Sequence, residues 1–269
     1  MQGGPRAGAS GSLPLAVSAL ALLVLLTGYA LAQAPPYRLQ RVDLVGAAHL
    51  RPEDVLVAAG LEPGALRWRH PAERIRRRLI EGEPWVRDAR VSWLPGGILR
   101  VEVTERTPVA LLPYYNLYAV LDADGVILRL ARLDEYRLPV ITGIPLPRGL
   151  RGEQVRHPHL AGALEAAELL PEAALADLSE LAVSPQGDLS LIFRGPVVAI
   201  LGPPTSLREK VLALLATGPD GGRTLLEEAR LTGHNVDLRN PARPTLSPGA
   251  AVPAPDAGEA GGADGAAGT

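Results

Sequence analysis

Residues 86–105 read VRDARVSWLPGGILRVEVTE, two alternating runs on either side of a turn. In each run every second residue is apolar, which is the spacing of a strand with one buried face. The residues between the runs, Leu94-Pro95-Gly96-Gly97, have the proline and glycine content of a tight turn. The stretch therefore predicts a β-hairpin. Its inward side chains are expected to be Ala89, Val91, Trp93, Leu99, Val101 and Val103.

A strand and two helices are expected before this hairpin. Residues 38–45 alternate in the manner of a strand. A helix opens at Pro52 and ends at Gly60, because proline suits the first helical position and glycine suits the C-terminal cap. A second helix begins near Pro71, with an apolar stripe opposite a face of arginines. The order β-α-α-β-β over residues 38–105 predicts a small α+β domain.

From Val109 onward the chain is richer in short strands. Apolar runs bounded by Gly, Pro and Asp predict a second hairpin around residues 122–125, followed by further strands. Helices are expected at residues 158–170 and 207–216. The expected strands are residues 117–121, 126–130, 138–141, 181–183, 189–193, 197–201 and 235–239. This pattern predicts a second, strand-rich α+β unit.

An uncharged apolar run from Leu13 to Ala32 lies near the N-terminus and holds eight leucines. Twenty helical residues rise about 30 Å, the thickness of a bilayer's hydrocarbon core. The run therefore predicts a single transmembrane helix at residues 13–32, behind a short cytoplasmic tail at residues 1–12. Ala30 and Ala32 also fit a signal peptidase site, so a signal cleaved after Ala32 stays open. Both interpretations place the bulk of the chain outside the cytoplasm.

A set of short stretches follows a fixed order along the chain. They are Tyr37-Arg38-Leu39, Val45-Gly46, Pro52-Glu53-Asp54-Val55, Pro84-Trp85-Val86, Leu94-Pro95-Gly96, Glu105-Arg106, Pro108-Val109-Ala110, Leu121-Asp122, Gly125-Val126-Ile127-Leu128, Leu138-Pro139-Val140-Ile141-Thr142-Gly143, Leu201-Gly202 and Val236-Asp237-Leu238-Arg239. In number and order they resemble the FtsQ/DivIB family of bacterial cell-division proteins, over roughly residues 13–240.

The resemblance implies a POTRA domain at residues 37–106 and a β domain at residues 107–240, beyond a single membrane anchor. It implies a non-enzymatic scaffold in the inner membrane at the division septum, with its N-terminus in the cytoplasm. The implied partners are FtsB- and FtsL-type division proteins and the septal peptidoglycan synthesis machinery. No cofactor, small-molecule substrate or nucleic acid is implied.

The resemblance also implies a partner-binding strand. In the family a partner adds to the last strand of the β domain, where unpaired backbone groups give affinity. The matching residues here are Asn235, Val236, Asp237, Leu238 and Arg239. Pro241 and Pro244 follow at once, and proline cannot donate to a ladder, so we expect a short edge. Residues 241–269 are rich in Pro, Ala and Gly and are expected to be disordered.

Other motifs give poor support for a catalytic or metal-binding site. Cysteine is absent, which excludes disulfides and thiolate zinc sites. His157 and His159 are interpreted as part of an exposed loop, and Asp122 and Asp124 as part of a hairpin turn rather than a calcium loop. The arginines within residues 74–78 are interpreted as the solvated face of a helix, with anionic lipid or an acidic partner as the alternative.

Two other function classes stay open. An exported hydrolase or binding protein would need a convergent nucleophile and base, for which five histidines scattered over loops give poor support. A POTRA module for outer-membrane protein assembly or secretion is a further alternative. The formal net charge of −2 gives no general attraction to nucleic acid or acidic lipid.

Overall fold

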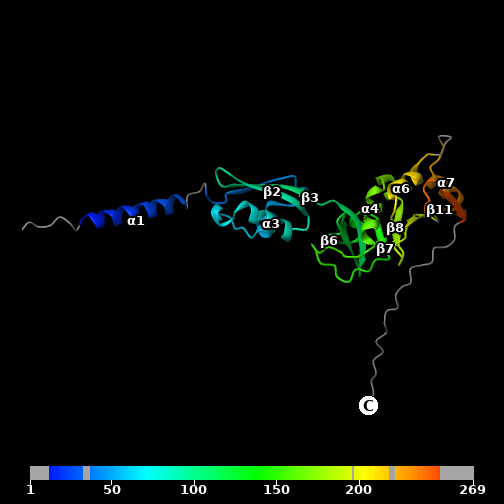
Figure 1. Ribbon diagram of the computed structural model, residues 1–269, viewed down its shortest axis with the longest axis horizontal. Coiled ribbons are helices and arrows are strands. Elements are labelled where there is room, and N and C mark those ends of the chain that lie inside the picture. Colours follow the sequence, from blue (N-terminus) through cyan, green and yellow to red (C-terminus); the bar gives the residue numbers. More distant parts are fainter. Residues whose placement is uncertain (1–11, 33–36, 196, 218–221, 249–269) are drawn as a thin grey trace, which may run out of the picture. The chain divides into compact units, whose positions relative to one another are not determined.

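The computed structural model describes residues 12–32, 37–195, 197–217 and 222–248 (Figure 1). The chain divides between Arg106 and Thr107 into two compact units. The first unit contains helix α1 (Ser12–Ala32) and a small α+β domain, and the second is strand-rich with helices packed on its sheet. The α+β class predicted from the sequence is therefore confirmed.

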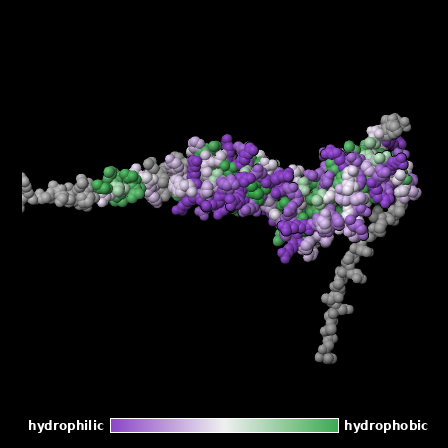
Figure 2. All heavy atoms as spheres, viewed as in Figure 1, coloured by the Kyte–Doolittle hydropathy of each residue, from purple (hydrophilic) through white to green (hydrophobic). Residues whose placement is uncertain are grey.

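Helix α1 coincides with the apolar run near the N-terminus. Its described side chains include Leu20, Leu23 and Leu25, all of them exposed, and Figure 2 shows this helix as a largely apolar surface. Within the part of the chain that the structure describes, no helix is both long enough and apolar enough to cross a membrane. The transmembrane segment at residues 13–32 stays a prediction. Nearly all of the expected cytoplasmic tail lies outside the described residues.

A three-stranded sheet forms the first unit. Its strands are β1 (Arg41–Val45), β2 (Val86–Leu94) and β3 (Ile98–Glu105), and its helices are α2 (Pro52–Ala59), the 3-10 helix η2 (Arg67–Arg69) and α3 (Ala72–Gly82). β3 lies in the middle, parallel to β1 and antiparallel to β2. The hairpin predicted from residues 86–105 is confirmed, with Val91 opposite Val101.

The core of this unit is built from the residues that the periodicities place inward. Val55 of α2, Leu79 of α3 and Leu99 of β3 have no exposed area. The hairpin turn requires glycine at position 97, where φ is +75° and a Cβ atom would overlap the carbonyl oxygen of Arg38. The Gly97 carbonyl instead accepts the Gln40 N–H at 2.8 Å, which fixes the start of β1 against the hairpin.

A nine-stranded sheet forms the second unit. Its strands are β4 (Pro108–Tyr114), β5 (Leu117–Asp122), β6 (Ile127–Ala131), β7 (Val140–Thr142), β8 (Leu178–Val183), β9 (Leu189–Phe193), β10 (Val198–Gly202), β11 (His234–Asp237) and β12 (Thr245–Pro248). They lie in the order β12-β11-β10-β9-β8-β7-β4-β5-β6. Consecutive strands mostly pair antiparallel, whereas β7 is parallel to both of its neighbours and β10 is parallel to β11.

Helices pack on this sheet and enclose one continuous core. They are α4 (Leu160–Leu169), α5 (Glu172–Leu175), α6 (Leu207–Leu215) and α7 (Leu225–Thr232). The 3-10 helix η3 (Leu133–Glu135) is exposed and contributes nothing to this core. Leu164 of α4, Val211 of α6 and Leu191 of β9 are among the buried residues of this core. α7 lies against β11 and α6 (Figure 1).

The expectation that residues 241–269 are disordered is wrong for residues 245–248, which form β12. Pro241 and Pro244 do not stop the sheet, because Pro241 lies second in a tight turn, a position that suits its fixed φ. The turn is closed by a bond from the Arg243 N–H to the Asn240 carbonyl (3.1 Å), and the Asn240 side chain accepts the Ala242 N–H. Residues 249–269 lie outside the described residues.

Candidate partner-binding edge

The sequence predicts that residues 235–239 form an open sheet edge, and the structure shows that this is wrong. β11 has neighbours on both sides. It pairs parallel with β10, with Val236 opposite Ala199, and antiparallel with β12, with Val236 opposite Leu246. The terminal strand of the sheet is therefore β12, which lies one strand beyond the predicted residues.

The hydrogen-bonding direction of β12 follows from that of β11. The Leu238 N–H donates to the Ile200 carbonyl on the β10 side at 2.8 Å. Because successive residues of a strand direct their backbone groups to opposite sides, Asn235 and Asp237 face β12. Their partners Ser247 and Thr245 face back toward β11. Leu246, between these two, then directs its N–H and C=O away from the sheet.

Prolines limit this outer margin. By the same alternation Pro244 and Pro248, two positions either side of Leu246, would also direct their backbone outward, and neither has an N–H. Over residues 244–248, where the structure describes it, the margin therefore offers one backbone donor, at Leu246, between two prolines that can only accept. Such a short, proline-flanked edge gives a partner strand little freedom in register and discourages uncontrolled pairing.

Side chains of the predicted residues support this margin. Val236 and Leu238 are fully buried in the core, and the Asn235 Oδ1 atom accepts the Val198 N–H at 3.2 Å. The Asp237 carboxylate accepts the Arg239 Nε–H at 2.9 Å, and this hydrogen bond holds the pKa of Asp237 below its ordinary value although burial opposes the shift. Arg239 is largely exposed, and its side chain lies close to Gly202 at the end of β10.

The opposite edge of the sheet is partly occupied. β6 is its terminal strand, and the loop between β7 and α4 bonds to the outer side of Ile127. The Ile127 N–H donates to the Glu153 carbonyl at 2.9 Å, and the Ile127 carbonyl accepts the Gly152 N–H at 2.7 Å. Arg129, further along β6, pairs with Glu135 at 2.6 Å. β12 is thus the better candidate for adding a strand.

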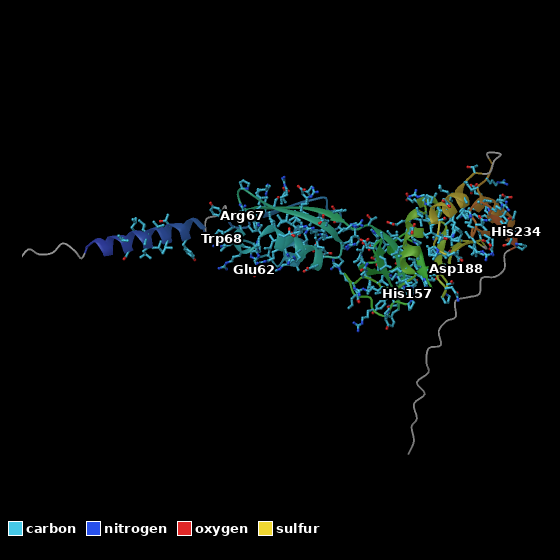
Figure 3. All side chains as sticks on the ribbon, in the orientation of Figure 1. Glu62, Arg67, Trp68, His157, Asp188 and His234 are labelled. Carbon is cyan, nitrogen blue, oxygen red and sulfur yellow. The ribbon has the colours of Figure 1, made fainter. Side chains whose placement is uncertain are left out.

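The histidine and aspartate motifs noted in the sequence lie in a loop and in a hairpin turn. His157 and His159 lie in the loop before α4, with ring centroids 5.5 Å apart (Figure 3 labels His157). Asp122 accepts the N–H groups of Asp124 and Val126 at 3.1 and 2.7 Å, so its carboxylate closes the hairpin turn that the sequence predicts. Among the described residues, no group of three or more His, Cys, Asp and Glu side chains is arranged to hold a metal ion.

The sequence interprets the arginines of α3 as a solvated face. In the structure some of them also form contacts within the first unit. Arg76 donates to the Ala89 carbonyl and to Asp88, both at 2.8 Å, and so joins α3 to β2. Arg78 donates to the Ala59 carbonyl at 3.1 Å and joins α3 to the end of α2. Two of these arginines therefore join elements of the first unit.

Comparison with known protein families identifies a domain in each of the two units. A model of the POTRA domain, FtsQ-type, matches residues 37–106, and a model of the cell division protein FtsQ/DivIB, C-terminal, matches residues 110–239. The chain belongs to the FtsQ/DivIB family. The C-terminal FtsQ/DivIB match ends at Arg239, so β12 lies just beyond it.

Curated FtsQ proteins resemble the chain over part of its length. The cell division protein FtsQ of Rhodothermus marinus is 31% identical over 165 residues, which is 57% of this chain and 56% of that protein. FtsQ of Syntrophotalea carbinolica is 28% identical over 58% of this chain and 56% of its own length, and FtsQ of Streptomyces collinus is 39% identical over 39% and 41%. The matched region therefore spans about half the length of these FtsQ relatives.

Proposed function

We propose that this FtsQ/DivIB-family chain is a membrane-attached, non-catalytic scaffold of the cell-division machinery. In this proposal a strand of an FtsB- or FtsL-type partner adds to the outer margin of β12 and extends the sheet of the second unit. The observation that supports it best is the register of β12, the terminal strand of the sheet in the described part of the chain. By strand alternation this register directs the Leu246 N–H and C=O away from β11. Recruitment and regulation of septal peptidoglycan synthesis would follow from this contact.

Asn235 to Arg239 remain part of the proposed site, in a changed role. Val236 and Leu238 hold β11 in the core, so they keep β12 in position rather than meeting the partner directly. The Asp237–Arg239 ion pair, whose exposed arginine lies close to Gly202 of β10, is a neighbouring charged group that a partner side chain could contact. Partner affinity would come from backbone bonds and specificity from such neighbouring side chains.

Membrane attachment through α1 is the second part of the proposal. Support comes from the sequence, since residues 13–32 hold no charged residue and an apolar helix of this length suits a bilayer. The N-terminus would then lie in the cytoplasm and both folded units outside it, at the septum. The mass of the mature N-terminus distinguishes this anchor from a signal cleaved after Ala32, since cleavage would leave Gln33 as the first residue.

Proline and alanine at position 246 test the proposed contact. Leu246→Pro removes the outward N–H, whereas Leu246→Ala keeps this donor and removes only the side chain. One lost backbone bond at a short edge should weaken partner capture roughly tenfold, and we expect the alanine variant to lose much less. The measurement is co-purification of the FtsB-type partner with the full chain from detergent-solubilised membranes, quantified by mass spectrometry.

Ser247→Pro serves as the matched comparison. Its N–H faces β11, so this change disrupts the attachment of β12 itself and should also abolish capture. Circular dichroism of each variant must match that of the unaltered chain, which excludes global unfolding. Full capture by both proline variants, or turnover of a cell-wall substrate by the unaltered chain, contradicts the scaffold proposal.

A further inference from the structure

A groove of about 480 Å³ lies beside Tyr37, in the α+β domain of the first unit. Its walls are Tyr37, Arg67, Trp68, Pro71, Ala72 and Trp93. Figure 3 shows Arg67 and Trp68 together at this end of the unit. The groove is open and partly aromatic, and neither the scaffold role nor the β12 margin uses it.

Backbone bonds hold these residues at the same end. The Leu39 N–H donates to the Ala65 carbonyl at 2.9 Å, and the Leu39 carbonyl accepts the Gly64 N–H at the same distance. These bonds fasten the segment after Tyr37 to the loop before η2. On the far wall, the Trp93 Nε1–H donates to the His70 carbonyl at 3.0 Å. The groove is therefore part of the fold and not a chance gap between loops.

Two large aromatic side chains stand exposed at its mouth. Tyr37 is 45% exposed and Trp68 is 50% exposed, and their ring centroids lie 6.2 Å apart. Each ring is apolar with a polar group at its tip. Such side chains are enriched where a membrane's headgroups meet water, because both parts of the ring find a suitable environment there.

Positive charge surrounds the aromatic pair. Arg67 and Arg69 flank Trp68 in η2 and are exposed, and within the described part of the chain no carboxylate is recorded against either guanidinium. Glu73, close by in sequence, bonds to Arg76 at 3.2 Å. The pKa of His70 is lowered first by burial and then by the nearby charges of Arg78, Arg74 and Arg69.

We propose that Tyr37, Arg67, Trp68 and Arg69 bind the anionic headgroups of phospholipids. The inference rests on the proposed attachment through α1. Five positions separate Ala32 from Tyr37, and a chain spans at most about 18 Å over that length. A surface tethered so closely to a bilayer meets headgroup phosphates at high local concentration, and arginine forks suit phosphate oxygens. The tether favours lipid over an acidic protein segment as the occupant.

Hydrogen exchange in lipid nanodiscs tests this surface. The full chain is placed in nanodiscs of phosphatidylcholine alone and in nanodiscs that also contain phosphatidylglycerol, and exchange over residues 64–72 is followed by mass spectrometry. We expect roughly tenfold slower exchange with phosphatidylglycerol, because two arginines should bind an anionic surface. We expect this difference to disappear at high salt, because salt screens the attraction.

Paired substitutions make the test specific. Arg67→Gln with Arg69→Gln should abolish the lipid-dependent protection. Arg137→Gln with Arg208→Gln removes the same charge from exposed positions of the second unit and should preserve it. Loss of protection in the control pair would show a general charge effect and would overturn the assignment of this surface.

The remaining outcomes separate this inference from the proposed function. Equal exchange in the two lipids overturns headgroup binding while leaving the anchor intact. Protection by an added polyglutamate peptide, without protection by phosphatidylglycerol, also overturns it and identifies an acidic protein partner. A chain that fails to enter nanodiscs at all overturns the anchor as well. None of these results depends on partner capture at β12.

Discussion

Glu105 joins the end of β3 to the loop between β1 and α2. Its Oε1 atom accepts the backbone N–H groups of Ala48, His49 and Leu50 at 2.9, 3.0 and 3.2 Å, and its Oε2 atom lies 2.8 Å from His49 Nδ1. The His49 ring stacks on Trp85 with centroids 4.2 Å apart. One carboxylate at the end of β3 thus fixes the connection from β1 to α2.

Replacing Glu105 tests this network. Burial raises the pKa of Glu105, but bonds from the His49 side chain and the backbone N–H groups outweigh it and lower the pKa below the ordinary value of 4.5. Glu105→Gln should lower the free energy of unfolding by about 2 kcal/mol at neutral pH, because charge-assisted bonds to several donors are lost. Urea unfolding measures this, and Glu102→Gln, an exposed position on the same strand, should cost little.

The pH dependence follows from the direction of the shift. A carboxyl whose folded pKa is depressed stabilises the fold above its unfolded pKa and loses that contribution as pH falls through the folded value. The difference between the unaltered chain and Glu105→Gln should therefore shrink below about pH 4.5. A difference that stays constant down to pH 2 would show that Glu105 acts through packing alone.

Among the strands and helices, β12 shows most clearly why no strand was predicted after residues 235–239. Its four residues carry little apolar periodicity, and the neighbouring prolines look like chain breakers. In the structure Pro241 forms the turn and β11 supplies the ladder, so pairing with a neighbouring strand replaces the missing local signal. β4 was not predicted for a similar reason. In β4, Pro113 looks like a chain breaker, but it lies beyond Leu111, where β7 pairs with β4, and so leaves that pairing intact.

Helix α7 was also missed, although its sequence carried a usable signal. Thr224 accepts the Glu227 N–H at 3.2 Å and Glu227 accepts the Thr224 N–H at 2.8 Å, a reciprocal capping box. Gly233 ends the helix with φ +68°. The Thr-x-x-Glu spacing and the closing glycine are both visible in the amino-acid sequence alone. By contrast, the β-α-α-β-β order and its core were predicted because each element there is amphipathic.

The proline that ends β12 should control how far the edge can pair. Pro248→Thr adds an outward N–H two positions after Leu246, which lengthens the row of donors. We expect this variant to self-associate at concentrations where the unaltered chain does not, as followed by sedimentation velocity of the detergent-solubilised full chain. Pro185→Thr, in the exposed turn between β8 and β9, is the matched control. Identical sedimentation of all three proteins would show that Pro248 does not restrict the edge.

For the molecule as a whole, family membership and the α+β class were accessible from sequence, and the identity of the terminal strand was not. The resemblance correctly identified the FtsQ/DivIB family, because many short stretches recur in order. The resemblance assigned partner binding to Asn235–Arg239. The sequence of one strand does not show whether that strand lies at the edge of a sheet, because this depends on which other strands pair with it. Only the sheet order, which places β12 outside β11, decides that question.

Site-specific photo-crosslinking tests the β12 margin most directly. A photoreactive phenylalanine analogue in place of Ser247 lies in the proposed contact strand, and the same analogue in place of Arg129 lies in β6 at the opposite edge of the sheet. In dividing cells, the account predicts a crosslink to an FtsB- or FtsL-type partner from position 247 and none from position 129. A partner crosslink from position 129 with none from position 247 would contradict it.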